Sequence, residues 1–294
     1  MKNTKFYLQA AMLLLPAFLS AQNVIPEPTQ YRPAKGQFVL TAAETKAFEA
    51  QDVLPGRVVQ CVISGSTPMD ADEAYHLKIT PDSVFIQSAT ATGAFRGKET
   101  LKQLLRSGKG TAKACVINDA PRYAWRGFML DESRHFFGKK KVKQLLDIMA
   151  SLRLNVFHWH LTDEPGWRIE IKKYPLLTQI GAKGNWHDPD APATFYTQDD
   201  IKEIVAYAAA RHIMVVPEFD MPGHATAACR AYPELSGGGE GRWKDFTFHP
   251  CKEETFRFIS DVLDELITLF PSPYIHIGGC LLYTSPSPRD RSLS

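Results

Sequence analysis

The chain has 294 residues, of which 44% are hydrophobic and 22% are charged, a balance that is ordinary for a globular protein. Lysine and arginine number 34 against 32 for aspartate and glutamate, and no long basic or acidic block is present, so nothing in the charge points to nucleic acid. The length allows one large domain or two medium ones.

The first residues have the features of a secretory signal peptide. Lys2 and Lys5 precede an apolar run, and the small residues Ser20 and Ala21 follow it. We therefore expect residues 1–21 to be removed and the protein to be exported to a periplasmic or extracellular location. A membrane anchor is the alternative, but the apolar run is short for a span of about 20 residues. No later segment is apolar enough to span, so no stable membrane span is expected.

Export would permit disulfides. The chain has five cysteines, and no two of them have the CxxC spacing that is typical of zinc sites: Cys61, Cys115, Cys229, Cys251 and Cys280. Cys229 and Cys251 flank a glycine-rich loop. They either form a disulfide across that loop or remain free thiols.

Residues 22–121 are predicted to form a small α/β domain. YHLKIT (75–80) and SVFIQSA (83–89) alternate apolar and polar residues around a turn, which predicts a β-hairpin. The segment GAFRGKETLKQLLRS (93–107) is predicted to be a helix. Pro121 interrupts regular structure, so we place a domain boundary there.

Strands and helices alternate from residue 122 to residue 279. The apolar runs predict strands at 125–131, 154–163, 213–220 and 274–279, the first and the last of them buried. The helical periodicity predicts helices at 139–152, 198–212 and 253–270. Thr197 and Asp200 have capping-box spacing at the start of the second of these helices. Such alternation indicates parallel βα units.

A (β/α)₈ barrel fits this pattern better than a doubly wound sheet. The first strand of a doubly wound sheet is usually followed by a glycine-rich phosphate loop, and DESRHFFG stands there instead. Polar residues collect where each predicted strand ends, as in barrel enzymes. Four of the eight strands of a barrel can be counted, so we predict an incomplete TIM barrel over residues 122–279.

The strand ends supply the candidate functional residues. Arg134 follows the first strand, where its planar fork could hold vicinal hydroxyls or a carboxylate of a substrate, or form a structural ion pair with Asp131. His158 and His160 alternate on the second strand and therefore face one side. Asp163 follows them. These histidines could form a packed network or, with His224, bind a metal.

The third strand end carries a further acidic and basic group. Glu218 and Asp220 alternate on one face, and His224 lies on the turn that Gly223 allows. A buried carboxylate can fix the tautomer of a histidine, and either Asp163 or Asp220 could do so for His224. Trp167 lies near the end of the second strand, where it could either form an exposed stacking surface or pack against its neighbours.

Four segments together resemble one known family. RGFMLDESRHF (126–136), HWHLTDEPGWRIEI (158–171), VVPEFDMPGH (215–224) and YIHIGG (274–279) have the order and spacing of the β-N-acetylhexosaminidases of glycoside hydrolase family 20. Residues 23–40 and 75–105 resemble the small α/β domain that precedes the barrel in that family. The resemblance extends over residues 24–279.

The resemblance implies a fold, a reaction and a substrate class. The family has a TIM barrel and removes terminal GlcNAc or GalNAc from glycans by retaining hydrolysis, in which the 2-acetamido group of the substrate attacks the anomeric carbon. The expected partner is therefore a glycan or amino-sugar substrate, and no cofactor or metal is implied.

The resemblance also implies roles for individual residues. Arg134 matches the arginine that holds the hydroxyls of the terminal sugar. Asp163 and His224 match the pair that supports the general acid, and Asp220 is expected to belong to the same network. The remaining two candidates, His160 and Glu218, are expected to line the substrate site behind Arg134.

The sequence departs from the family at one point. The family continues its fourth strand as His-Ile-Gly-Gly-Asp-Glu, where the Asp orients the acetamide and the Glu is the general acid/base. Cys280 and Leu281 stand at those positions here. Residues 280–294 resemble translated vector or adapter sequence, so we expect a non-native disordered tail and an inactive fragment of a longer parent enzyme. A natural short paralogue with a disordered tail is the alternative.

Two other functions remain open at the level of sequence. A non-catalytic sugar-binding module would use Arg134 and the strand-end acids without hydrolysis. A metal hydrolase would instead bind a metal ion through His158, His160 and His224.

Overall fold

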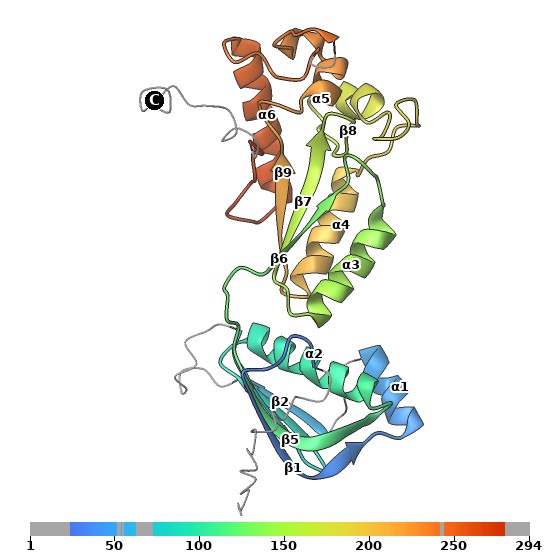
Figure 1. Ribbon diagram of the computed structural model, residues 1–294, viewed down its shortest axis with the longest axis vertical. Coiled ribbons are helices and arrows are strands. Elements are labelled where there is room, and N and C mark those ends of the chain that lie inside the picture. The colour runs from blue at the N-terminus through green and yellow to red at the C-terminus, as the bar shows by residue number, and fades with distance from the viewer. Residues whose placement is uncertain (1–23, 52–53, 55, 63–72, 242–243, 280–294) are drawn as a thin grey trace, which may run out of the picture. The chain divides into compact units, whose positions relative to one another are not determined.

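A computed structural model describes residues 24–51, 54, 56–62, 73–241 and 244–279 of the chain (Figure 1). The chain divides into two compact units, Met1–Pro121 and Arg122–Ser294. The predicted signal peptide and the predicted tail from residue 280 onward both lie outside the described residues. Within the described residues, no helix has both the length and the apolar character that crossing a membrane requires.

The first unit contains a five-stranded sheet. The strands are β1 (Gln30–Val39), β2 (Val58–Val62), β3 (Tyr75–Ile79), β4 (Val84–Ser88) and β5 (Thr111–Asp119), in the order β1-β5-β3-β4-β2. β3 and β4 pair antiparallel, which confirms the predicted hairpin. β2 pairs with β4 in parallel, and the remaining pairs are antiparallel.

Two helices accompany this sheet: α1 (Ala42–Gln51) and α2 (Ala91–Ser107). Thr90 precedes α2 and caps it, because its hydroxyl accepts a hydrogen bond from the backbone N–H of Gly93. Leu101 and Leu104 of α2 are buried together with Leu77 and Ile86 of the hairpin. The helix predicted at 93–107 is therefore confirmed, and its apolar face forms the core with the sheet.

The second unit is built around three parallel strands. β6 (Gly127–Asp131) and β9 (Met214–Phe219) each pair in parallel with the central strand β7 (Val156–Asp163). The short β8 (Gly166–Trp167) turns back antiparallel on the end of β7. The carboxyl ends of the three parallel strands therefore meet at one edge of the sheet, where the candidate residues lie.

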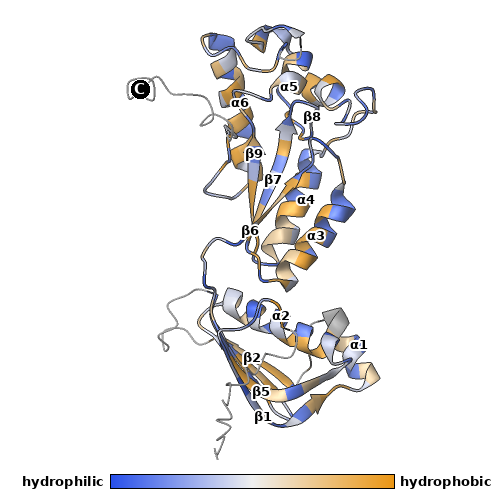
Figure 2. Ribbon diagram, viewed as in Figure 1, coloured by the Kyte–Doolittle hydropathy of each residue, from blue (hydrophilic) through white to orange (hydrophobic). Residues whose placement is uncertain are grey.

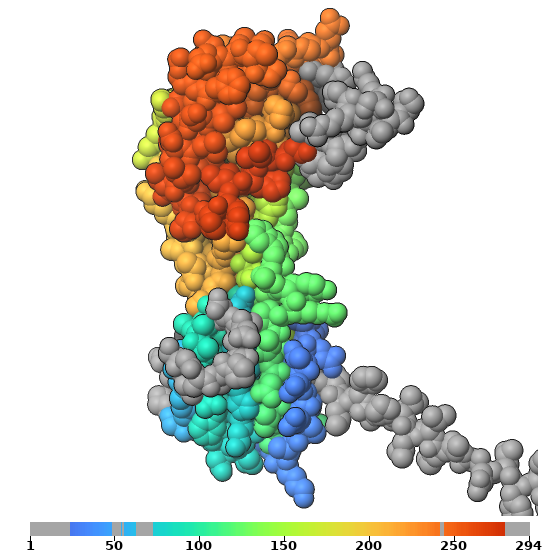
Figure 3. Space-filling model, turned by 90° about the vertical axis from the view of Figure 1, so that its left-hand side faces the viewer, coloured from blue at the N-terminus to red at the C-terminus, as the bar shows by residue number. Residues whose placement is uncertain are grey.

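Helices follow these strands in the order expected of βα units. They are α3 (Lys139–Ser151), α4 (Gln198–Ala209) and α6 (Glu253–Leu269), and three shorter helices lie between them: η1 (Leu177–Gly181), α5 (Thr226–Ala231) and η2 (Pro233–Leu235). Hydrophobic and hydrophilic residues alternate along α3 and α4 (Figure 2). α6 and the segment after it, in red, form much of one face of this unit (Figure 3).

Local sequence signals explain where two of these helices lie. The capping box at the start of α4 is present, since the Thr197 hydroxyl accepts from the N–H of Asp200 and the Asp200 carboxylate accepts from the N–H of Thr197. On α3 the apolar residues Val142, Leu146 and Met149 lie on one face and are buried. These faces cover the sheet, as parallel strands require.

The predicted fold class is confirmed as an α/β fold with an N-terminal sheet domain and an incomplete TIM barrel, with two local differences. β6 was expected to be buried, but Phe128 is 45% and Met129 is 49% exposed, because among the described residues β6 pairs on one side only. The fourth strand is an isolated parallel bridge between Glu218 and His276. Backbone hydrogen bonds still hold this segment along β9, from the N–H of Phe219 and of Met221.

The cysteine pairing left open by the sequence is also resolved within the described residues. Cys229 is a buried free thiol and Cys251 is an exposed free thiol, so no disulfide spans the glycine-rich loop in this structure. Burial raises the pKa of the Cys229 thiol to about 12. The thiol is therefore neutral and unreactive at ordinary pH.

Candidate active site

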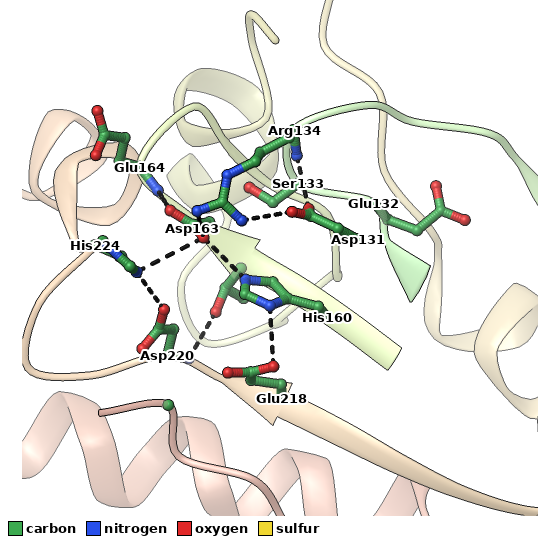
Figure 4. A network of polar contacts seen from close by, with 12 residues as sticks. Asp131, Glu132, Ser133, Arg134, His160, Asp163, Glu164, Glu218, Asp220 and His224 are labelled. Atoms are coloured by element: carbon green, nitrogen blue, oxygen red, sulfur yellow. Dashed lines mark hydrogen bonds and ion pairs between the residues drawn. The ribbon is translucent and has the colours of Figure 1, made fainter. Parts of the chain in front are cut away.

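The candidate residues gather at the carboxyl ends of β6, β7 and β9 (Figure 4). Arg134 lies in the loop after β6 and reaches two carboxylates. Its Nη1 is 2.5 Å from Oδ2 of Asp131, and its Nη2 is 2.8 Å from Oδ2 of Asp163. The ion pair with Asp131 is therefore present, but it leaves 35% of the Arg134 side chain exposed. The guanidinium is held in place at both ends and remains open to a ligand.

Asp163 is the centre of the network. Its side chain is fully buried at the end of β7 and takes Arg134 on one side and His160 on the other, with Nε2 of His160 at 3.0 Å from Oδ2. The backbone N–H of Glu164 donates to Oδ1 at 2.6 Å. Burial opposes ionisation, but His160, this N–H and nearby cations outweigh burial and lower the pKa of Asp163. Asp163 is therefore a buried carboxylate anion.

His160 connects two strands through its two ring nitrogens. Nδ1 lies 2.9 Å from Oε2 of Glu218 on β9, and Nε2 faces Asp163. Burial disfavours the imidazolium, but the two carboxylates outweigh burial and raise the pKa of His160 to about 10. A charged His160 therefore lies between two anions, as Figure 4 shows.

His224 lies on the turn after β9 and is 20% exposed. Its Nδ1 is 2.6 Å from Oδ2 of Asp220 and 3.7 Å from Oδ2 of Asp163. Of the two acids that the sequence left open, Asp220 is the direct partner, and its hydrogen bond raises the pKa of His224. The backbone of His224 has φ +54, a conformation that non-glycine residues adopt at a cost and that often marks functional sites.

Glycine permits a close approach beneath this pair. Gly278 has φ +73, and a Cβ built there would lie 1.6 Å from Oδ1 of Asp220. The segment that carries His276 can therefore pack against the end of β9 only with a glycine at this position. The backbone N–H of Asp220 donates to the Thr162 hydroxyl at 3.0 Å, which holds the Asp220 backbone to the end of β7.

A buried arginine that the sequence analysis did not identify supports the loop that carries Arg134. Arg168 is fully buried, and burial lowers its pKa to about 10. Its guanidinium donates to backbone carbonyls of the β6 loop and of the segment after η1: Glu132, Ser133, Ala182, Gly184 and Thr194. The N–H of Trp186 in that segment donates to the Arg134 carbonyl. Arg168 therefore joins the loop that carries Arg134 to the segment after η1.

Glu132 reinforces the same loop from the other side. Its carboxylate accepts from the hydroxyl of Tyr196 at 2.8 Å and from the backbone N–H of Phe137 at 2.7 Å. Burial raises the pKa of Glu132. Figure 4 shows that Glu132 points away from the network of Asp163, so its role is to shape the loop.

Two further expectations are settled by geometry. Trp167 is 2% exposed and packs edge-on against Phe219, so it belongs to the core and is not a stacking surface. The metal set of His158, His160 and His224 is wrong: no grouping of possible metal ligands among the described residues unites these three. The reason is that His160 turns toward Asp163 and Glu218, while His224 turns toward Asp220.

Comparison with known proteins places this arrangement in a family. Residues 123–284 match the model of glycosyl hydrolase family 20, catalytic domain, and residues 63–120 match that of glycosyl hydrolase family 20, domain 2. A beta-hexosaminidase of Porphyromonas gingivalis is 34% identical over 96% of this chain and 41% of its own length. The chain thus spans less than half the length of that relative.

Solved structures agree. A beta-N-acetylhexosaminidase from Bacteroides fragilis superposes with a TM-score of 0.75 at 34% identity, covering 88% of this chain and 57% of the other. An exo beta-N-acetylglucosaminidase from Vibrio harveyi, solved with N-acetylglucosamine, has a TM-score of 0.76 at 31% identity, covering 93% of this chain and 49% of the other. Sequence, fold and strand-end network together show that the chain belongs to glycosyl hydrolase family 20, the family of the beta-hexosaminidases.

Proposed function

We propose that residues 122–279 carry the sugar-holding half of an exo-β-N-acetylhexosaminidase site, with terminal GlcNAc or GalNAc as the sugar. The main observation in favour of this proposal is the position of Arg134. Asp131 and Asp163 hold its guanidinium at the strand ends, yet 35% of its side chain is exposed. A fork held in this way offers its free N–H groups to adjacent sugar hydroxyls at little entropic cost. The names of the relatives and the bound N-acetylglucosamine of the Vibrio harveyi structure support the substrate class.

We further propose that hydrolysis in the parent enzyme is substrate-assisted. The acetamido carbonyl of the sugar attacks its own anomeric carbon, so the protein supplies one general acid/base and one carboxylate that orients the acetamide. The attack is intramolecular and therefore benefits from a high effective molarity once the sugar is held. Arg134 would contribute by holding that sugar.

The network behind Arg134 supplies the electrostatic support. The hydrogen bond to Asp220 raises the pKa of His224 and so favours its charged form. Asp163, with a lowered pKa, balances Arg134 and the charged His160. Fixed charges in a partly buried site act on a neighbouring acid more strongly than charges in water. Asp163 and His224 are therefore positioned to tune a general acid at the next strand end.

In this chain the acid itself is missing from the sequence. Cys280 and Leu281 stand where the resemblance expects the orienting Asp and the acidic Glu. A leucine side chain has no proton to transfer, and general acid help is worth about 10²–10⁴-fold in rate. We therefore propose that the chain as written does not hydrolyse glycosides, although it retains the residues that support the sugar.

The proposed location is outside the cytoplasm. Lys2, Lys5 and the apolar run that ends near Ala21 motivate this proposal. Sequencing the amino terminus of protein recovered from the periplasm or the medium would test it, and we expect a first residue near Gln22. An intact Met1 on exported protein would contradict it.

Hydrolysis of an aryl β-N-acetylglucosaminide tests the proposed activity. Three proteins are compared: this chain, the double variant Cys280→Asp with Leu281→Glu, and residues 1–279 joined to the corresponding continuation of a family 20 relative. We expect background rates from the first two and turnover from the third. Turnover by the first would show that the catalytic groups have been misassigned. Binding of N-acetylglucosamine without turnover by the third would favour a sugar-binding module.

A further inference from the structure

His158, Glu218 and His276 form a cluster that the proposed sugar chemistry does not use as a unit. Nε2 of His158 lies 2.7 Å from Oε2 of Glu218, and Nδ1 of His276 lies 3.0 Å from Oε1 of the same carboxylate. The two imidazole rings are 4.5 Å apart between centroids. The three side chains come from β7, from β9 and from the segment bridged to β9 at His276. Two nitrogens and a carboxylate thus converge from three neighbouring elements.

The electrostatic surroundings of this cluster differ from those of the other possible groups of metal ligands. The Glu218 carboxylate is 6% exposed, and the described residues give it contacts with imidazoles alone: those of His158, His160 and His276. The two other groupings of possible metal ligands both contain Asp163. The guanidinium of Arg134 lies 2.8 Å from that carboxylate, so a metal ion there would meet a fixed positive charge. Among the described residues no guanidinium contacts the Glu218 carboxylate, whose cationic partner is His160 at 2.9 Å from Oε2.

We propose that His158, Glu218 and His276 bind one divalent transition-metal ion, of the kind represented by Zn²⁺ or Co²⁺. Imidazole and carboxylate ligands suit these ions. Ligand atoms about 2.0 Å from a tetrahedral ion are roughly 3.3 Å from one another. One ligand atom from each of the three side chains lies within 4.8 Å of the other two, which is close enough for one ion to be shared after local adjustment. The side chains of His158 and His276 are 24% and 44% exposed, which leaves access for the ion and for a water ligand.

Neighbouring groups would orient the ligands. His160 holds Oε2 of Glu218 at 2.9 Å and is itself held by Asp163, so the carboxylate is fixed from behind (Figure 4). Such partners of the ligands commonly change metal affinity about 10–100-fold. The N–H of Gly278 donates to Nδ1 of His276 at 3.1 Å, so metal binding replaces that hydrogen bond with a coordination bond. The site goes beyond the proposed hydrolase chemistry, in which neither His158 nor His276 has a role.

A Co²⁺ titration of the full chain, made without a polyhistidine tag, tests the proposal. Co²⁺ is chosen because its visible absorption reports coordination number and a near-ultraviolet charge-transfer band would reveal ligation by cysteine. We expect one equivalent to bind without that band. His276→Ala and Glu218→Gln should each weaken binding at least tenfold, while His187→Ala, outside the cluster, should leave affinity unchanged. Equal affinity in all four proteins, or no saturable binding, would overturn the proposal.

A second measurement on the unsubstituted chain does not depend on the folding of the variants. Paramagnetic Co²⁺ broadens the imidazole proton signals of the histidines closest to it. We expect the signals of His158 and His276 to broaden first and that of His187 to stay sharp. Broadening that begins at other histidines would refute the site.

Discussion

Nε2 of His160 lies 3.0 Å from Oδ2 of Asp163, inside the strand-end network of the second unit. Asp163 is fully buried and has a lowered pKa, while His160 has a raised pKa. The contact therefore joins a charged imidazole to a carboxylate anion. Because of this contact, the stability of the second unit depends on pH.

Stability of the second unit should fall as the solution becomes alkaline. The pKa of His160 is about 10 in the folded chain, against an ordinary 6.5. Because the folded-state pKa is the higher one, the stabilisation is complete below about pH 6.5 and is lost as pH rises toward about 10. Urea unfolding across this window should show the decline. His160→Asn should flatten it, and the exposed control His187→Asn should not.

Asp163→Asn should destabilise the second unit. The amide keeps the shape of the carboxylate but removes the charge that balances Arg134 and His160, so we expect the free energy of unfolding to fall by about 1–3 kcal/mol. Denaturant unfolding measures this loss. Asp199→Asn is the matched control, because its side chain is 95% exposed. A loss no larger than that of the control would show that the charge of Asp163 does not stabilise the folded second unit.

Gly278→Ala should disturb the Asp220–His224 pair. Two effects combine: an alanine at φ +73 costs about 1–2 kcal/mol, and its Cβ would lie 1.6 Å from Oδ1 of Asp220. Gly238→Ala is the control, since its φ is +85 and nothing lies within 4 Å of a Cβ there. We expect a larger loss of stability at 278 and a shifted imidazole signal for His224 only in that variant. Equal losses with an unchanged His224 signal would contradict the account.

The sequence predicted most of the elements and most of the network, for physical reasons. Hydrophobic periodicity located α3, α4 and α6, and the Thr197–Asp200 spacing located one helix start. Alternation on β7 placed His158 and His160 on one face, and both contact Glu218. Each of these patterns lies within a short stretch of sequence, so it can be recognised without knowledge of the tertiary contacts.

The remaining features depend on contacts that local patterns do not encode. Burial of Phe128 depends on whether a further strand pairs with β6, and among the described residues none does. Arginine usually lies at the protein surface. Arg168 is nevertheless fully buried, because five backbone carbonyls from two loops that are distant in the sequence converge on it. The choice of Asp220 over Asp163 as partner of His224 depends on the turn after β9.

Arg168→Met should loosen the loops around Arg134. The substitution keeps an apolar stem but leaves buried carbonyls without a donor, so we expect at least about 3 kcal/mol less stability. Limited proteolysis should then cut within residues 182–194. Arg211→Met is the control, because Arg211 bonds Asp147 on the neighbouring helix and touches neither loop. Resistance to cleavage equal to that of the control would rule out this supporting role.

Steady-state kinetics of residues 1–279 joined to a family 20 continuation tests the central claim most directly. With an aryl β-N-acetylglucosaminide, Arg134→Ala should lower kcat/KM by about 10²-fold or more, because fixed donors to the sugar are lost. Asp163→Asn and His224→Ala should lower kcat by about 10²-fold through weaker support of the general acid. Arg211→Ala should change neither constant. Turnover in the three site variants equal to that of the parent would contradict the claim that these strand-end residues form the hexosaminidase site.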